Sequence, residues 1–348
     1  MTSGPAAAAR SLPARGRLDR NELEALGRVL AAASLWAFGA IVAKRWVIGD
    51  GVGALDVAQL RALTGGALLL AVLAAWRPAT LRVDRRALVV AACYGVGGLV
   101  TAQAGYYIAI ERLPVGVALT IQYLAPIAVC AIGYVFLRER GGPLLFVAAG
   151  VAALGTWLIT AGSSGGPLDG IGVAASFVSA AGFAAVVLIG RWGTRRAGLD
   201  PGALVAYGLV AAAIAWSIAR PWWNFPWSEM DLTAWLGLIW IAAFATAVPF
   251  TLMAGATNRV AAGRAAIAAT WEPVAGAVLG ALLLSESMGL LQIAGAALVL
   301  SAVALSERSA ARPAPPPEPT PDPQAVGRNE SITGSQRRRN ASYSAGGA

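Results

Sequence analysis

The sequence predicts an all-α integral membrane protein with ten transmembrane helices, arranged as two inverted five-helix repeats. Three observations support this fold class. Hydrophobic residues make up 57% of the chain and charged residues only 13%, with a mean hydropathy of +0.64, whereas a soluble domain carries about 25% charged residues. The apolar residues also form blocks long enough to cross a bilayer, and the two halves of the chain resemble each other.

The apolar blocks are the predicted membrane spans. A stretch of about 20 apolar residues crosses the hydrocarbon layer as a helix. Barrel strands would be about half as long and would alternate apolar and polar residues. These blocks do neither, so helices are the remaining option in lipid. The expected helices run roughly over residues 29–47, 57–76, 87–110, 115–137, 144–161, 171–189, 203–219, 232–256, 265–284 and 288–305.

Polar segments flank these helices. Residues 1–28 read as a basic cytoplasmic leader. The first helix runs into Lys44 and Arg45 without the small-residue site of a cleaved signal peptide. Residues 309–348 are rich in proline and arginine, and we expect a disordered cytoplasmic tail, because such a segment cannot bury enough apolar area to fold. Its arginines could contact anionic lipid headgroups or simply be solvated.

The lysines and arginines behind the net charge of +9 are unevenly distributed along the chain, and their distribution indicates the membrane topology. Lysine and arginine are frequent in the leader and after the even-numbered helices, and rare after the odd-numbered ones. This bias predicts both termini in the cytoplasm of a multi-pass protein of the cell inner (plasma) membrane. It also explains the basicity without nucleic acid as a partner. The segment between the second and third helices alone holds Arg77, Arg82, Arg85 and Arg86.

The chain lacks the residues that several kinds of functional site require. The chain has no histidine, which excludes imidazole metal sites and histidine proton relays. Cys93 and Cys130 fall inside predicted helices, where packing is a better explanation than a disulfide. Lys44 is the only lysine, and no phosphate-binding loop of the G-x-x-x-x-G-K type is present. We therefore expect no cofactor, no metal and no ATP-driven pump.

An internal repeat organises the chain. Sliding the sequence so that the fourth helix falls on the ninth matches residues 29–161, the first repeat, to residues 171–306, the second. Because five is an odd number, the second repeat must enter the membrane from the opposite side. Inverted repeats of this kind are typical of secondary transporters. The matched residues include Arg112 with Arg259, Gly116 with Gly263, Pro126 with Pro273, Gly133 with Gly280, Glu139 with Glu286, and Arg45-Trp46 with Arg191-Trp192.

Pro126 and Pro273 sit near the middle of their helices. Each removes one backbone hydrogen bond and clashes with the carbonyl four residues earlier. Polar backbone at membrane mid-depth is tolerated where protein or a water-filled cavity satisfies it. A plain packing kink is the alternative, but the paired occurrence favours two helix breaks that face each other across one cavity.

Glu272 is the most informative single residue. It lies near mid-bilayer, where a carboxylate costs several kcal/mol unless it is paired, protonated or hydrated. Small residues share its helix face, which predicts that it points inward. It could bind a substrate ammonium group, exchange a proton for substrate, or make a structural hydrogen bond.

Further polar residues lie in the first repeat. Arg61, in the second turn of its helix, either snorkels to the headgroups or turns inward to an anionic substrate group. The other candidate substrate-binding residues, which would add polar groups to the same cavity, are Gln103, Tyr107, Gln122 and Tyr123.

Two segments resemble the fourth-helix region of the EamA domain, in the drug/metabolite transporter superfamily. They are YLAPIAVCAIGYVFLRER, from Tyr123, and TWEPVAGAVLGALLLSESMGLLQIAGAALVL, from Thr270. Both show a mid-helix proline, small residues, an apolar run and a terminal glutamate. The resemblance covers about residues 29–306, and implies a ten-helix carrier with a central cavity that moves small polar metabolites, often outward.

Two further motifs resemble one particular branch of this superfamily. Arg61 in QLRALTGG and the Glu-Pro pair of the ninth helix resemble the threonine and homoserine exporter branch. The small four-helix multidrug relatives differ, since they carry a glutamate in the first helix, and this chain has no acid there.

We therefore expect a secondary transporter, an exporter of small polar metabolites such as amino acids, and not an enzyme. A membrane-embedded enzyme would need a nucleophile with a base, or metal ligands. A non-transporting scaffold or sensor would not need polar groups clustered on small-residue stripes. The expected partners are a small-molecule substrate and membrane lipids. Proton coupling, facilitated diffusion and a homodimer are all compatible with this architecture.

Overall fold

The computed structural model describes residues 20–47, 52–113, 115–137, 142–160, 169–284 and 289–310. Most of the expected leader, the tail from residue 311, and the matched residues Glu139 and Glu286 lie outside them. Over the described residues, ten helices are long and apolar enough to cross a membrane, which confirms the predicted number. Called spans 1 to 10 below, they are Arg20–Val47, Ala54–Trp76, Arg85–Ile110, Val117–Phe136, Pro143–Thr160, Gly170–Arg195, Pro201–Ala219, Leu232–Thr257, Ala262–Leu283 and Leu290–Arg308.

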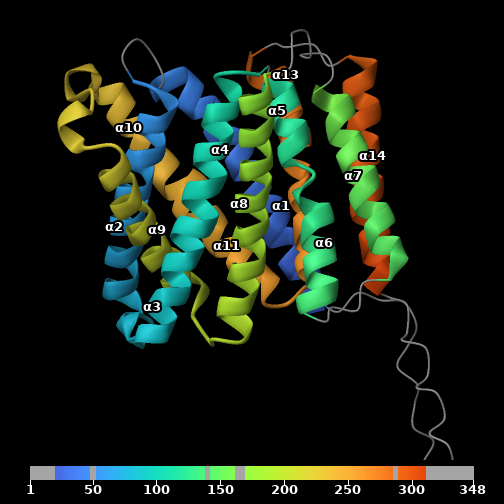
Figure 1. Cartoon of the computed structure of the whole chain (residues 1–348), viewed down its shortest axis with the longest axis horizontal. Coiled ribbons are helices and arrows are strands. Elements are labelled where there is room, and N and C mark those ends of the chain that lie inside the picture. Colours follow the sequence, from blue (N-terminus) through green and yellow to red (C-terminus); the bar gives the residue numbers. More distant parts are fainter. Residues whose placement is uncertain are drawn as a thin grey trace, which may run out of the picture. The chain divides into compact units, whose positions relative to one another are not determined.

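Five spans are single helices and five combine several helical elements (Figure 1). The single helices are α2 (Ala54–Trp76), α7 (Pro143–Thr160), α8 (Gly170–Arg195), α9 (Pro201–Ala219) and α14 (Leu290–Ala310). Span 1 consists of α1 (Arg20–Val42) and the π-helical turn η1 (Ala43–Val47). Spans 3 and 8 each have a π-helical middle: span 3 consists of α3 (Arg85–Ala92), η3 (Cys93–Val100) and α4 (Thr101–Ile110), and span 8 of α10 (Leu232–Ala242), η7 (Ala243–Ala247) and α11 (Val248–Thr257). Spans 4 and 9 are each divided into two α-helices: span 4 into α5 (Val115–Gln122) and α6 (Ala125–Phe136), and span 9 into α12 (Ala262–Ala269) and α13 (Trp271–Leu284).

Aspartates fix the starts of four helices. Asp84, Asp169, Asp200 and Asp231 precede α3, α8, α9 and α10, and each side chain accepts a hydrogen bond from a backbone N–H of the first turn. Such a cap satisfies a donor that the helix itself leaves without a partner, and contributes about 1 kcal/mol. These capping residues mark where the chain enters a span.

The first helix begins at Arg20, well ahead of the apolar block at residue 29 that predicted it. Its first turn carries Glu22, and a carboxylate there interacts favourably with the positive end of the helix dipole. Hydropathy detects only the part of a helix that contacts lipid, so this polar extension was not predicted. It places Glu22 and Glu24 beside the ends of other spans.

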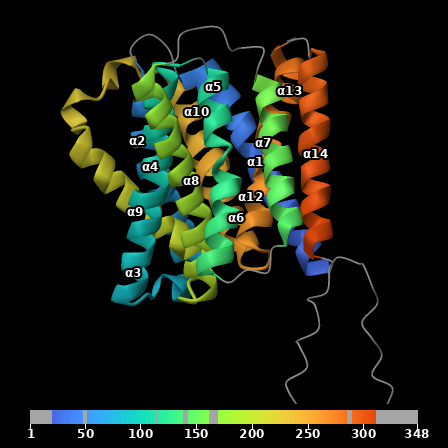
Figure 2. The same ribbon diagram turned by 45° about the vertical axis from the view of Figure 1, so that its right-hand side comes forward.

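The main pairs of packed helices follow the symmetry between the two repeats. α4 packs on α8 as α1 packs on α11, and these two pairs correspond to each other in the two repeats. α2 packs on α9 and α7 packs on α14, and the repeat maps each of these pairs onto itself. α7 and α14 run side by side in both ribbon views (Figures 1 and 2). This pattern is that of two inverted five-helix repeats related by a pseudo-two-fold axis.

Glycines allow the closest helix contacts. A Cβ added to Gly95 would lie 2.0 Å from the Gly208 carbonyl oxygen, and one added to Gly295 would lie 2.5 Å from that of Gly155. Small residues at these positions let the backbones of neighbouring spans meet, as is usual between membrane helices.

The described chain begins and ends at the same face of the helix bundle. Arg264, at the start of span 9, forms ion pairs with Glu22 at the start of span 1 and with Glu307 at the end of span 10. We call this side the terminal face, and the side where span 1 ends and span 2 begins the distal face.

Candidate functional site

Spans 4 and 9 are interrupted at matched positions. α5 ends at Gln122 and α6 begins at Ala125, whereas α12 ends at Ala269 and α13 begins at Trp271. Pro126 and Pro273 lie in the first turns of the second half-helices, where a missing N–H leaves no helical bond unmade. Each half-helix therefore starts in the middle of its span, with the positive end of its dipole inside the bundle.

Glu272 lies at this inner end of a half-helix, in the first turn of α13. The Tyr123 hydroxyl donates a hydrogen bond to its carboxylate. Tyr123 is buried, only 3% exposed, and lies in the interruption of span 4. The interruptions of the two repeats therefore meet, and the contact joins the acid of one repeat to the hydroxyl of the other.

A cavity of about 400 Å³ adjoins Glu272. It extends from the middle of the bundle toward the distal face, since its wall includes Ala43 near the end of span 1 and Ala54 at the start of span 2. A volume of this size falls within the range usual for small-molecule sites. The polar and charged residues of its wall are Arg61, Gln103, Tyr106, Tyr107, Gln122 and Glu272.

Arg61 is turned inward, not toward the headgroups. Its Nε donates to Thr246 Oγ1 at 2.9 Å, and a terminal nitrogen donates to the Ala245 carbonyl oxygen at 2.9 Å. Both partners belong to the π-helical turn η7, and π-helical turns often occur at functional sites. Arg61 also lies close enough to Glu272 to interact with it electrostatically. The wall thus carries a guanidinium group and a carboxyl group near one another.

Amide and phenol groups line the same cavity. Gln103, Tyr106 and Tyr107 lie on one face of α4, and the two tyrosine rings are in contact, with centroids 5.6 Å apart. The Gln122 amide oxygen accepts a hydrogen bond from Ser179 Oγ at 3.0 Å, which fixes the end of α5 against α8. These groups can bind polar atoms of a ligand without adding charge.

Aromatic and aliphatic residues form the remainder of the wall. Trp36 from α1 packs against Phe183 of α8 and Phe250 of α11, with ring centroids 6.3 and 5.1 Å apart. These three rings form a packed aromatic part of the cavity wall. The wall therefore combines polar groups with apolar ones.

The structure brings together most of the residues singled out from sequence. Arg61, Gln103, Tyr107, Gln122 and Glu272 all line the cavity, and Tyr123 is buried behind Glu272. The expectation that the two prolines face each other across the cavity is wrong, because neither Pro126 nor Pro273 is among its lining residues. Their influence is on the helix path, which exposes the residues beside the break.

Sequence reasoning missed part of the site. Trp36, Phe183 and Phe250 lie in apolar helices and have no local feature that separates a cavity wall from ordinary packing. Tyr106 was not missed, because the sequence places it one helical turn after Gln103 and therefore among the polar residues of that helix. Thr246 gave no signal, since its role depends on a π-helical turn in an alanine-rich stretch.

Comparison with known proteins assigns the chain to a family. The model of the EamA-like transporter family matches residues 25–161 and again residues 170–307. The chain is 30% identical over 261 residues to the threonine/homoserine exporter RhtA of Escherichia coli (strain K12) and of Salmonella typhimurium (strain SL1344), which covers 72% of this chain and 81% of theirs.

Two further matches are more distant. The uncharacterized inner membrane transporter YicL of Salmonella typhimurium is 24% identical over 288 residues, covering 80% of this chain and 93% of its own. A solved structure titled "Crystal structure of protein" shares the fold, with a TM-score of 0.70, 18% identity, and coverage of 82% of this chain and 96% of that one. The double family match and the inverted repeat agree, and the chain belongs to the EamA-like transporter family of membrane transporters.

Proposed function

We propose that this protein is a secondary transporter that exports small, net-neutral amino acids across the inner membrane. The observation that carries the proposal is the joint presence of Arg61 and Glu272 in one cavity at the middle of the bundle. The relatives named as threonine/homoserine exporters support the same substrate class.

The two charges suit the two ends of an amino acid. A guanidinium binds a carboxylate through paired, charge-assisted hydrogen bonds. Arg61 is held by Thr246 and Ala245, so its orientation is fixed before the substrate arrives. A carboxylate such as that of Glu272 binds an ammonium group. Among the described residues of the wall only these two are charged, so a zwitterion with an uncharged side chain leaves no charge without a partner.

The inverted repeat supplies a means of movement. Two structurally similar halves can pack in two related ways, one with the cavity toward each face. With both termini in the cytoplasm, as the charge bias predicts, the cavity toward the distal face opens to the outside. This would be the state from which an exporter releases its substrate.

Glu272 has two possible roles in such a cycle. It could bind the substrate ammonium group directly, or take up a proton on the outside and release it inside for each substrate exported. Both roles need a carboxylate that can be reached from the cavity. A response of transport to an imposed pH gradient separates them.

A substrate panel in proteoliposomes tests the proposal. Vesicles containing the purified protein are loaded with one radiolabelled amino acid at a time, and efflux and counterflow are measured against protein-free vesicles. We expect saturable transport of small hydroxylated and aliphatic amino acids, and little of lysine or glutamate. Transport of charged amino acids at equal rates, or of no amino acid by protein that is folded by circular dichroism, would contradict the proposal.

A further inference from the structure

Several ion pairs between the spans follow the symmetry of the repeat. At the terminal face Arg259 pairs with Glu24 at 3.4 Å, and at the distal face its matched residue Arg112 pairs with Asp169 at 4.0 Å. Each pair joins the connection between the third and fourth helices of one repeat to the start of the first helix of the other repeat. Contacts that exist at both faces do not favour one orientation of the cavity over the other.

The packed pair α2 and α9 is also bridged at both of its ends. Arg77 pairs with Asp200 at 3.2 Å at the terminal face, and Arg220 pairs with Asp56 at the distal face. The two bridges therefore hold this helix pair together whichever face the cavity opens toward.

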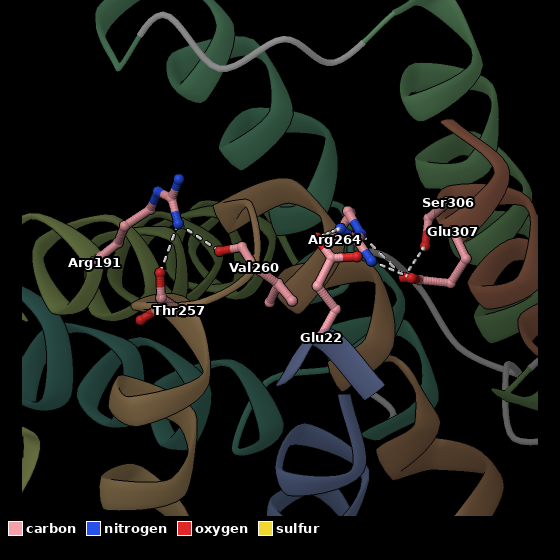
Figure 3. Close-up of polar contacts among 7 residues, drawn as sticks. All are labelled: Glu22, Arg191, Thr257, Val260, Arg264, Ser306 and Glu307. Carbon is pink, nitrogen blue, oxygen red and sulfur yellow. Dashed lines mark hydrogen bonds and ion pairs between the residues drawn. The ribbon is translucent and has the colours of Figure 1, made fainter. Parts of the chain in front are cut away.

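Arg264 breaks this symmetry. Its side chain is only 5% exposed and pairs with Glu22 of α1, at 3.2 Å, and with Glu307 of α14 (Figure 3). Its Nε also donates to Glu307 at 3.1 Å, so the guanidinium holds that carboxylate through two nitrogens. The cluster thus ties spans 1 and 10 to the start of span 9 at the terminal face.

At the distal face the places that match Arg264 and Glu307 are neutral, whereas Glu22 falls on Asp169, the partner of Arg112. In the first repeat, Val117 matches Arg264 and Thr160 matches Glu307. Thr160 instead shares a hydrogen bond with Thr120 at 2.6 Å. A cluster of one buried arginine with two carboxylates therefore has no equivalent among the described residues of the other face.

A second arginine at the terminal face shows the same bias. Arg191 is 9% exposed and donates to the carbonyl oxygens of Thr257, at 2.6 Å, and Val260, which closes the end of α11 (Figure 3). Arg45, its match in the first repeat, is exposed, and Ile110, the match of Thr257, lines the cavity. Buried arginines therefore seal the face away from the cavity.

We propose that Arg264, Glu22 and Glu307 form a one-sided latch, which holds the terminal face closed while the cavity faces the distal side and opens when the cavity turns. A buried arginine that loses its partners carries a large free-energy penalty, so the latch can open only where water reaches it. Contacts present in one orientation and absent in the other set the balance between the two. The proposal rests on the proposed transport function only in requiring two orientations of the cavity, whatever the substrate.

The labelling rates of two introduced cysteines report which face the cavity opens toward. Cys93 and Cys130 are first replaced by serine and alanine. Ala54→Cys reports the cavity wall toward the distal face, and Ala266→Cys reports the terminal side, since Ala266 is fully buried and matches the cavity-lining Leu119. Each single-cysteine protein is purified in detergent, and its rate of labelling by a water-soluble maleimide is measured without substrate.

Removing the latch should change the two rates in opposite directions. We expect Arg264→Gln to raise labelling of Ala266→Cys and lower that of Ala54→Cys, with a change in their ratio of at least roughly threefold as the population shifts. Arg264→Lys, which keeps the charge, should give a smaller change. Arg112→Gln combined with Arg259→Gln is the matched control, because it removes the balanced arginine from each face, and it should leave the ratio unchanged.

The ratio of the two labelling rates decides whether the latch exists. An unchanged ratio in folded Arg264→Gln protein, or an equal change in the control that combines Arg112→Gln with Arg259→Gln, would overturn the latch. If Arg264→Gln does not fold, Glu22→Gln removes the more exposed partner, and it must shift the ratio in the same direction for the proposal to stand. Because labelling needs no substrate, a failure of amino-acid efflux with an intact shift would count against the proposed function alone.

Discussion

At the scale of single residues, the proposed substrate class depends on Arg61 and Glu272, which both line the cavity. Each was visible in the sequence as a charge inside an apolar block. Their contacts were not visible, because Arg61 is held by Thr246 and Ala245 of span 8 and Glu272 by Tyr123 of span 4. Such partners are set by packing between distant spans, which a single sequence does not encode locally.

Arg61→Gln should weaken substrate binding. Hydrogen bonds to charged groups are worth about 1.5–3 kcal/mol, so we expect the KM for efflux to rise roughly tenfold or more. Arg61→Lys should recover part of the loss, since it restores the charge without the planar fork. Arg77→Gln, at the other end of the same helix and 62% exposed, is the control and should leave KM unchanged. An unaltered KM in Arg61→Gln would remove Arg61 from the site.

At the scale of elements, the half-helices and the close helix contacts position the site. The matched prolines predicted where spans 4 and 9 depart from regular helix, because proline cannot continue the hydrogen-bond pattern. The π-helical turns η3 and η7 also occupy matched positions, but neither was predicted. Their sequences contain no residue type that specifies an extra residue in a helical turn.

Gly95→Ala should destabilise the contact between η3 and α9. The added Cβ would lie 2.0 Å from the Gly208 carbonyl oxygen, and a backbone atom cannot rotate away. Overpacking of this kind typically costs about 1–3 kcal/mol. Gly97→Ala is the matched control in the same turn, since nothing lies within 4 Å of its added Cβ. Thermal unfolding in detergent should show a lower midpoint for Gly95→Ala alone, and equal midpoints for the two variants would contradict this packing.

At the scale of the whole molecule, the odd number of spans per repeat predicted the inverted architecture, and the paired helix contacts confirm it. What the repeat could not predict is how its halves differ. Arg264 lies at the polar edge of an apolar block and Glu22 beyond the edge of another, so neither stood out in the sequence. Their pairing depends on which ends of spans 1, 9 and 10 come together.

The orientation in the membrane is a prediction of its own. A reporter that is active only in the cytoplasm should be active when fused after Leu305, near the end of α14. The same reporter inserted at Gly165, in the segment that joins the two repeats and outside the described residues, should be inactive. Activity at Gly165 would place the joining segment inside the cell, and would reverse the direction of transport inferred from the cavity.

Efflux by the Glu272→Gln variant tests the central claim most directly. Glutamine keeps the shape and can still bond to Tyr123, but it cannot pair with an ammonium group or release a proton. In proteoliposomes with and without an imposed pH gradient, we expect efflux to fall at least about tenfold, equivalent to 1.4 kcal/mol, or to lose its response to the gradient, while folding survives. Glu229→Gln, in the exposed segment between spans 7 and 8, should transport normally. Efflux by Glu272→Gln at the wild-type rate, with the same response to pH, would show that Glu272 only packs and that the binding site lies elsewhere.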